Sequence, residues 1–163
     1  MHDIGKVGIP DSILLKPGRL SVEEFEVMKT HAALGREALE QAERQMGRSA
    51  PFLTFAKEIA GSHQEKWDGS GYPEGLAGER IPVSARLMAV ADVYDALVSA
   101  RPYKKPMSHE RACEIITEGR SSHFDPNVVD AFLVLHLQFK KTAEDLRDII
   151  NDETVSPHQG ATL

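Results

Sequence analysis

The chain has 163 residues, of which 41% are hydrophobic and 27% charged, a balance typical of one folded domain rather than of a disordered or fibrous chain. The formal net charge is −6, from 19 basic and 25 acidic residues, so long nucleic acid is not expected as a partner. The single cysteine, Cys113, excludes an internal disulfide and a zinc–thiolate cluster, and we expect it to be a buried apolar thiol. There is no signal segment and no apolar run near the roughly 20 residues of a membrane span, which favours a cytoplasmic protein without a membrane partner.

The first strong helix signal is a capping box. Ser21 is followed three positions later by Glu24, so each side chain can accept a hydrogen bond from the other residue's backbone N–H. Apolar and small residues then recur with a period near 3.6. The pattern predicts one long helix over 21–46, which ends at Gly47.

The rest of the chain also favours helices. They are expected over 52–62, 82–100, 108–117, 126–137 and 142–150, with Pro82 and Pro126 in first turns. Two Gly/Pro-rich segments, 10–18 and 68–78, show no strand pattern and are expected to be loops. The predicted fold class is all-α, with one domain over 1–152 and a disordered tail over 153–163.

Most of the chemical information lies in groups of histidines and carboxylates. They are His2-Asp3, His31, His63 with Gln64 and Glu65, and the pair Asp92 and Asp95. Imidazole and carboxylate suit iron, manganese, cobalt or zinc. A carboxylate can bridge two ions whereas an imidazole binds one, so Asp3 is the candidate bridge. Gly5 is expected to adopt the left-handed conformation that ends a helix at this motif.

Each of these residues also has a simpler interpretation. His31 could be a hydrogen-bonded core histidine and His63 a cation at a helix end. Asp92 and Asp95 could form solvated ion pairs, although their alanine-rich neighbours suggest a buried face, where carboxylates need a partner. The remaining histidines are assigned surface or packing roles: His109, His123, His136 and His158.

Five strings decide between these interpretations. They are HDIGKVGIPD at 2–11, KTH at 29–31, HQEKWDGSGYP at 63–73, ADVYDAL at 91–97 and RPYK at 101–104. In order and spacing they resemble the HD-GYP subgroup of the HD phosphohydrolase superfamily over roughly positions 2 to 135. The extended Gly-Tyr-Pro string makes this resemblance more specific than a lone His-Asp pair.

The resemblance implies an all-helical, metal-dependent phosphodiesterase that hydrolyses cyclic di-GMP to the linear dinucleotide or GMP. It implies divalent metal ions, two of them and most often iron or manganese, and a place beside a diguanylate cyclase or other signalling domain in bacterial two-component signalling. By matching motifs, one metal would be bound by His2, Asp3 and Asp92, and the second by Asp3, His31 and His63. Asp3 and Lys6 would be catalytic, and the substrate would be contacted by Lys6, Asp95, Arg101 and Lys104.

The loop over 68–78 has two expected features. Gly69 and Gly71 should adopt unusual backbone angles. Tyr72 and Pro73 should either rim a substrate groove or dock a partner domain.

Two departures from the family pattern matter. Gln64 stands where relatives commonly have histidine, and an amide oxygen is a weaker ligand for these metals. The sequence also begins at the His-Asp motif, so helices that pack behind it in the family are expected to be missing, which favours a homodimer that covers apolar surface. The alternative function is therefore a degenerate module that binds cyclic di-GMP or a partner protein without hydrolysis. A third function that the sequence leaves open is hydrolysis of a phosphoester other than cyclic di-GMP.

Overall fold

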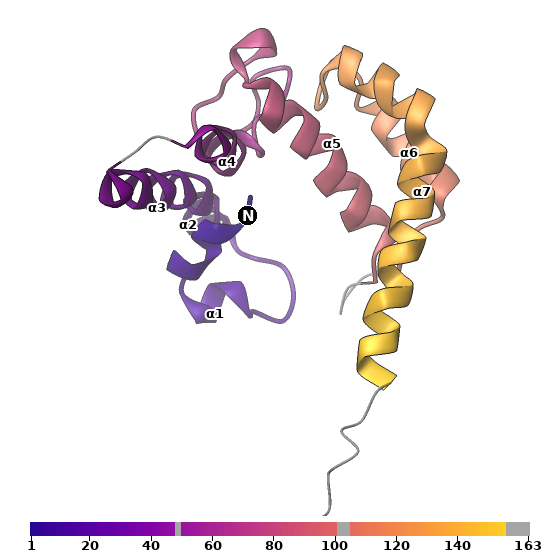
Figure 1. Cartoon of the computed structure of the whole chain (residues 1–163), viewed down its shortest axis with the longest axis horizontal. Coiled ribbons are helices and arrows are strands. Elements are labelled where there is room, and N and C mark those ends of the chain that lie inside the picture. Colours follow the sequence, from indigo (N-terminus) through magenta and orange to yellow (C-terminus); the bar gives the residue numbers. More distant parts are fainter. Residues whose placement is uncertain (48–49, 101–104, 156–163) are drawn as a thin grey trace, which may run out of the picture.

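The computed structural model describes residues 1–47, 50–100 and 105–155. Its elements in chain order are η1 (Ile4–Gly8), α1 (Asp11–Leu14), α2 (Val22–Lys29), α3 (His31–Met46), α4 (Pro51–Ser62), η2 (Gly78–Arg80), α5 (Val83–Val98), α6 (His109–Glu118) and α7 (Pro126–Val155). Nowhere in these ranges is there a β-strand, which confirms the all-α prediction (Figure 1).

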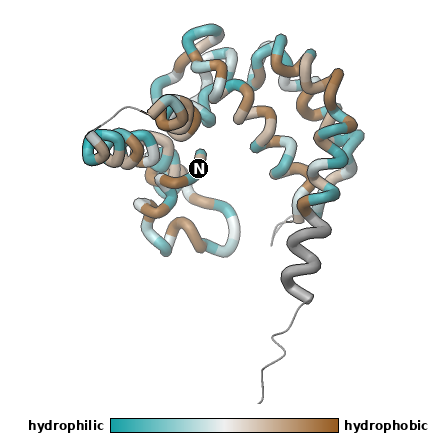
Figure 2. The backbone as a smooth tube through the Cα atoms, viewed as in Figure 1, coloured by the Kyte–Doolittle hydropathy of each residue, from teal (hydrophilic) through white to brown (hydrophobic). Residues whose placement is uncertain are grey.

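The helices form two packed groups that α5 connects. At one end η1 and α4 pack on α3, and at the other α6 and α7 pack together; α5 contacts α4 as well as α6 and α7 (Figure 1). Hydrophobic and hydrophilic residues alternate along α5, as expected for a helix with a buried side (Figure 2). The larger core joins α5, α6 and α7 and includes Val90, Ile116 and Val129. A smaller one joins α3 to α4.

The predicted capping box is present. Ser21 Oγ accepts a hydrogen bond from the Glu24 N–H at 3.2 Å, and Glu24 Oε2 accepts one from the Ser21 N–H at 2.7 Å. Gly47, with φ of 64°, ends α3 as predicted.

The prediction of one helix over 21–46 is wrong, because the chain divides into α2 and α3 at Thr30. Thr30 Oγ1 donates to the Val27 carbonyl at 2.7 Å, and His31 Nδ1 lies 2.8 Å from the Met28 carbonyl oxygen. Side chains thus bond carbonyls that would otherwise accept helical N–H groups, and such local bonds interrupt a helix. The break places His31 at the first position of α3.

Four further expectations need correction. The predicted interruption between 137 and 142 is wrong, because α7 runs on without glycine or proline, supported by an ion pair from Lys141 to Asp145 one turn later. The segment 10–18 contains the short helix α1. Pro82 is the N-cap of α5, whereas Pro126 is the first residue of α7 as predicted. The predicted tail begins at 153, but α7 includes residues 153–155, and 156–163 lie outside the described residues.

A buried ion pair fixes the start of α7 against α5. Arg86 Nη1 lies 2.9 Å from Asp125 Oδ2, with side-chain exposures of 14% and 3%. Arg86 Nε also donates to the Ile81 carbonyl at 2.6 Å, and Asp125 Oδ1 accepts the Asn127 N–H at 2.8 Å. Residues of α5 and α7 line a cleft between the two helices, so the angle between the helices determines the shape of that cleft. Of the helices described, none is both long and apolar enough to cross a bilayer.

Candidate metal centre and adjoining cleft

Asp3, His31 and His63 converge from three separate segments of the chain. Asp3 precedes η1, His31 begins α3 and His63 follows α4. Asp3 Oδ1 lies 3.6 Å from His31 Nε2 and 3.8 Å from His63 Nε2, and the two Nε2 atoms are 3.4 Å apart. Both imidazoles are buried. Three ligand atoms therefore surround one point.

Backbone carbonyls determine which ring nitrogen faces this point. His31 Nδ1 lies 2.8 Å from the Met28 carbonyl oxygen, and His63 Nδ1 lies 3.0 Å from that of Ile59. A carbonyl oxygen only accepts hydrogen bonds, so each Nδ1 carries the proton and each Nε2 presents a lone pair. Metal-binding histidines typically donate their other N–H in this way. Two buried lone pairs and a carboxylate oxygen that face one another fit a divalent cation.

Asp3 has the geometry expected of a bridging carboxylate. Its Oδ1 faces His31 and His63, whereas its Oδ2 lies 3.3 Å from His2 Nε2. His2 Nε2 is in turn 3.6 Å from Asp92 Oδ1 on α5. Asp3, His31 and His63 thus form one group of three potential ligands. His2 lies between Asp3 and Asp92 and joins the remaining predicted ligand to this group.

The charges around the centre keep these side chains in the forms that bind metal. Partial burial acts to raise the pKa of Asp3, but the hydrogen bond and positive charge of Lys6, whose Nζ is 2.7 Å from Oδ2, lower it below its ordinary value. Burial, and then the neighbouring His31, lower the pKa of His63. An ionised Asp3 and a neutral His63 are the forms that bind a cation.

Gly5 brings these ligands together by its small size. The expectation of a left-handed Gly5 is wrong, since its φ is not positive and it lies within η1. A Cβ at this position would lie 2.5 Å from the Gly35 backbone nitrogen and would overlap the His31 carbonyl oxygen. Glycine therefore allows η1, which follows Asp3 directly, to contact the first turns of α3, which begin at His31.

A family model for the HD domain matches residues 1–128. The chain belongs to the HD domain family.

The HD-GYP resemblance is likewise confirmed by similarity to named phosphodiesterases. A probable cyclic di-GMP phosphodiesterase from Vibrio cholerae is 60% identical over 148 residues, which cover 91% of this chain and 34% of that protein. A cyclic di-GMP phosphodiesterase from Thermotoga maritima is 46% identical over 160 residues, 98% of this chain and 41% of that protein. A 3′3′-cGAMP-specific phosphodiesterase from Vibrio cholerae is 46% identical over 133 residues, 82% of this chain and 24% of that protein. The HD domain described here thus spans between a quarter and two fifths of the length of these relatives.

The Gly-Tyr-Pro loop of this HD domain is held by a buried glutamate. The two carboxylate oxygens of Glu65 accept the backbone N–H groups of Glu74 at 2.7 Å and Leu76 at 3.0 Å. The loop thereby places the Tyr72 ring against His31, with ring centroids 6.3 Å apart. Burial, together with Asp3 and Asp92, raises the pKa of Tyr72 to about 12. Tyr72 thus lies beside the metal centre, and its two predicted uses, at the rim of a substrate groove or in docking a partner domain, stay predictions.

The two glycines of this loop differ in their roles. Gly69 has the positive φ that was predicted, of 85°. The same prediction for Gly71 is wrong: its φ is not positive, but a Cβ there would lie 2.5 Å from the Glu65 Cα. Close backbone packing therefore requires glycine at this position.

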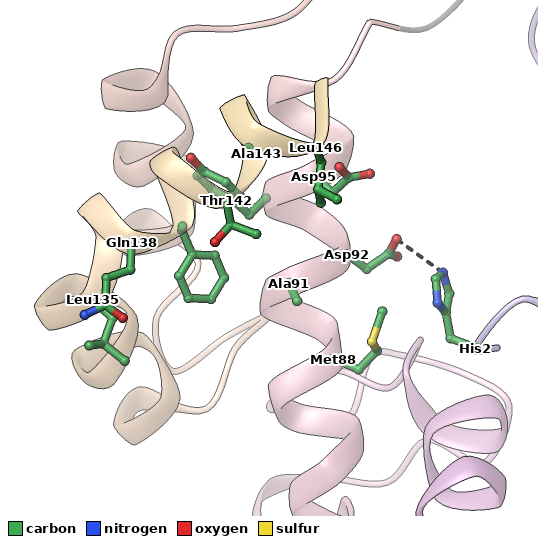
Figure 3. A pocket seen from close by; sticks show the side chains of 12 residues that line it. His2, Met88, Ala91, Asp92, Asp95, Leu135, Gln138, Thr142, Ala143 and Leu146 are labelled. Atoms are coloured by element: carbon green, nitrogen blue, oxygen red, sulfur yellow. Dashed lines mark ion pairs between the residues drawn. The ribbon is translucent and has the colours of Figure 1, made fainter. Parts of the chain in front are cut away.

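A cleft of about 480 Å³ extends from the metal centre between α5 and α7 (Figure 3). His2, Asp92 and Asp95 lie on one side of it, and His2 and Asp92 point toward one another (Figure 3). The rest of the wall is largely apolar and comes from both helices: Met88, Ala91, Leu135, Phe139, Ala143 and Leu146. The HD domain thus combines a carboxylate–imidazole centre with an apolar cleft of ligand size.

The predicted substrate-binding residues have different outcomes. Lys6 is ion-paired with Asp3, beside the centre. Asp95 lines the cleft but is exposed and accepts a hydrogen bond from Ser99 Oγ at 2.8 Å, so the expectation of a buried face at Asp95 is wrong. Arg101 and Lys104 lie outside the described residues. Gln64 is partly buried next to His63, and its backbone carbonyl accepts the Tyr72 N–H at 3.2 Å; its role as a ligand stays a prediction.

The sequence carries no signal for the part of the site that α7 contributes. Leu135, Phe139 and Leu146 line the cleft because the chain reverses direction after α6 and places α7 beside α5. No local sequence pattern marks them as cleft residues. Lys29 is a further residue near the site that was not predicted, and its Nζ lies 5.8 Å from the centroid of the Tyr72 ring. The position of Lys29 in the KTH string, two residues before a ligand, was the available signal.

Proposed function

We propose that this HD domain is a metal-dependent phosphodiesterase that hydrolyses cyclic di-GMP to the linear dinucleotide or to GMP, as the output domain of a bacterial signalling protein. The observation that carries the proposal is the geometry of Asp3, whose Oδ1 faces His31 and His63 and whose Oδ2 faces His2. One shared carboxylate suits a pair of divalent cations, and iron and manganese suit this mixture of imidazole and carboxylate. The names of the similar proteins support the choice of substrate.

The reaction adds water across a phosphorus–oxygen bond: the water oxygen bonds to phosphorus, and the 3′ oxygen leaves as an alcohol with one proton. Divalent ions held by these side chains would supply the Lewis acid that polarises the phosphoryl group and activates the water. The carbonyl-anchored His31 and His63 would orient the centre without rearrangement. Lys6 would place its ammonium, now 2.7 Å from Asp3 Oδ2, where negative charge develops on the phosphoryl oxygens.

The cleft supports a substrate that has a flat, largely apolar base next to a phosphate. Its volume of about 480 Å³ lies within the usual range of ligand pockets. A base stacked between α5 and α7 would leave its phosphate near His2 and Asp92. The centre and cleft are rich in carboxylates, so Arg101 and Lys104, which follow α5 in the sequence, are proposed to bind the substrate phosphates.

The test is hydrolysis of cyclic di-GMP by the full-length protein, reconstituted without oxygen with iron or manganese. We expect metal-dependent formation of linear dinucleotide or GMP, and its loss in Asp3→Ala. Cyclic GMP-AMP belongs in the same substrate panel, because one similar protein is named for that substrate. No turnover of any cyclic dinucleotide by metal-loaded protein would remove the proposal.

The second candidate function is binding without hydrolysis, and Gln64 is the observation that favours it. An amide oxygen in place of an imidazole would weaken one metal position. Gln64→His separates the candidates. Turnover that appears only in this variant, with cyclic di-GMP binding by the native protein in calorimetry, would indicate a binding module.

Exposed apolar side chains on α7 support a homodimer as part of the proposal. Val134 is 82% exposed and Leu137 is 65% exposed, and exposed apolar groups often mark an interface. We expect a mass of two chains in solution at working concentration. A monomeric mass would refute this part alone.

A further inference from the structure

A second set of metal-binding side chains lies away from the Asp3 centre, between α6 and α7. His109 and Cys113 are four residues apart on α6, so they share one helix face, and His136 approaches them from α7. One potential ligand atom of each lies within 4.8 Å of the others. All three are partly buried; His109 contacts both of the others, and Cys113 packs against the larger core. The expected packing role of the two histidines and the expected apolar surroundings of Cys113 fit this arrangement, although Cys113 is partly rather than fully buried.

Two of the three distances among these atoms are close to those in the first coordination sphere of zinc, and the third pair, His136 and Cys113, lies within 4.8 Å. His109 Nε2 lies 2.9 Å from His136 Nδ1 and 3.6 Å from Cys113 Sγ. With bond lengths of roughly 2.0 Å to nitrogen and 2.3 Å to sulfur, a tetrahedral zinc ion spaces its ligand atoms about 3.3–3.6 Å apart. The sulfur already has this separation, and the two nitrogens need to part by only a few tenths of an ångström. The imidazole rings are nearly parallel, with 10° between their planes.

Tyr94 supplies the outer contact that zinc-bound histidines usually have. Its hydroxyl oxygen lies 2.8 Å from His109 Nδ1, on the side of the ring opposite His136. A hydroxyl oxygen can accept the Nδ1–H bond, which would leave the Nε2 lone pair for a metal. Tyr94 is buried on α5 and packs against Phe132 and Phe139, so this contact is held in place.

The charges nearby tolerate a divalent cation. A second cavity, of about 260 Å³, reaches His109 and is lined by Glu110, Lys140 and Glu144. The Lys140 ammonium lies 3.8 Å from a Glu110 oxygen, and Glu144 adds a further carboxylate.

We propose that His109, Cys113 and His136 bind one zinc ion, which fastens α6 to α7. Its ligands are two imidazoles and one thiolate, a set that suits zinc better than the oxygen-preferring cations. The site is separate from the Asp3 centre and does not depend on the proposed function. Tyr94 also lines the cleft beside Asp92, so zinc would fix one wall of that cleft from behind.

Cobalt(II) is the probe that distinguishes the two centres. The chain contains one cysteine, and the Asp3 centre contains no sulfur, so a near-ultraviolet thiolate-to-cobalt absorption band reports Cys113 alone. Titration of the reduced 163-residue chain without oxygen should give this band, with the intensity of one cobalt–thiolate bond per chain, and added zinc should abolish it. Asp3→Asn should keep the band, whereas Cys113→Ala should lose it.

Two variants test whether the histidines and Tyr94 take part. His136→Gln should lose the band although the thiol is intact, and circular dichroism checks that each variant keeps its helices. Tyr94→Phe keeps the ring but removes the hydroxyl, and should weaken cobalt binding by roughly 10-fold, the usual cost of losing an outer partner. Absence of the band in the native protein, or a band unchanged in His136→Gln, would overturn the proposal and leave a hydrogen-bonded cluster only.

Discussion

Replacement of Gly5 by alanine tests whether the contact between η1 and α3 positions the metal ligands. The new Cβ would lie 2.5 Å from the Gly35 nitrogen and would overlap the His31 carbonyl oxygen. Both atoms are backbone, so η1 must move by about 1 Å to restore ordinary contact distances. Overpacking of this kind costs about 1–3 kcal/mol. Because the φ of Gly5 is not positive, alanine offsets about 0.4–1 kcal/mol of this by restricting the unfolded chain.

The free energy of unfolding should fall by about 1–2 kcal/mol in total. For a chain of this size, each kcal/mol lost lowers the Tm by about 2–4 °C. Since the displaced carbonyl belongs to His31, manganese binding should weaken roughly 10-fold or more, as when an outer partner of a ligand is removed. Thermal unfolding of the metal-free protein and calorimetric titration with manganese measure the two effects.

Gly8→Ala is the matched control within η1. Its Cβ would meet only the Leu34 side chain, at 2.9 Å from Cδ1, and that side chain can rotate away. It should keep wild-type manganese affinity. If Gly5→Ala kept both its Tm and its affinity, or if Gly8→Ala lost as much, the reasoning about this contact would be refuted.

Three further perturbations have defined outcomes. Glu65→Gln keeps one acceptor oxygen but loses the charge that holds two loop N–H groups, so it should cost about 1–3 kcal/mol in urea unfolding; an unchanged midpoint would contradict the role of Glu65. Arg86→Met leaves the carboxylate of Asp125 buried without its partner, so it should lower the free energy of unfolding by about 3–5 kcal/mol. A decrease smaller than that of Glu65→Gln would contradict the role given to this ion pair. The lowered pKa of His63 means that the unfolded chain binds its proton more tightly than the folded one. In metal-free protein its contribution to stability is therefore fully present above the ordinary pKa of 6.5 and is lost as the pH falls from 6.5 through the lower folded value. His63→Asn should flatten the dependence of unfolding free energy on pH in that window, and an unchanged slope would contradict the assignment.

Local chemistry made part of the fold predictable. The capping box at Ser21 and the stop at Gly47 depend on residues within four positions, and both are present. The break at Thr30 was missed because its cause is a competition for carbonyls, in which the Thr30 and His31 side chains also bond the carbonyl oxygens of Val27 and Met28. A periodic pattern carries no sign of such competition.

The candidate site was predictable from motifs but not from periodicity. The resemblance named His2, Asp3, His31, His63 and Asp92, and the structure brings these five residues together. What brings them together is long-range packing, above all the approach of η1 to α3 at Gly5 and Gly35. The same limit explains why the His109–His136 contact was missed, since it depends on how α7 returns along α6.

The central claim is that Asp3 joins two metal positions in one centre. Anomalous diffraction at the manganese edge, from crystals grown with manganese, tests it most directly. The account predicts two peaks, one among Asp3, His31 and His63 and the other among His2, Asp3 and Asp92, with both lost in Asp3→Ala. Manganese bound elsewhere, with no peak at Asp3 while cyclic di-GMP is still hydrolysed, would contradict it.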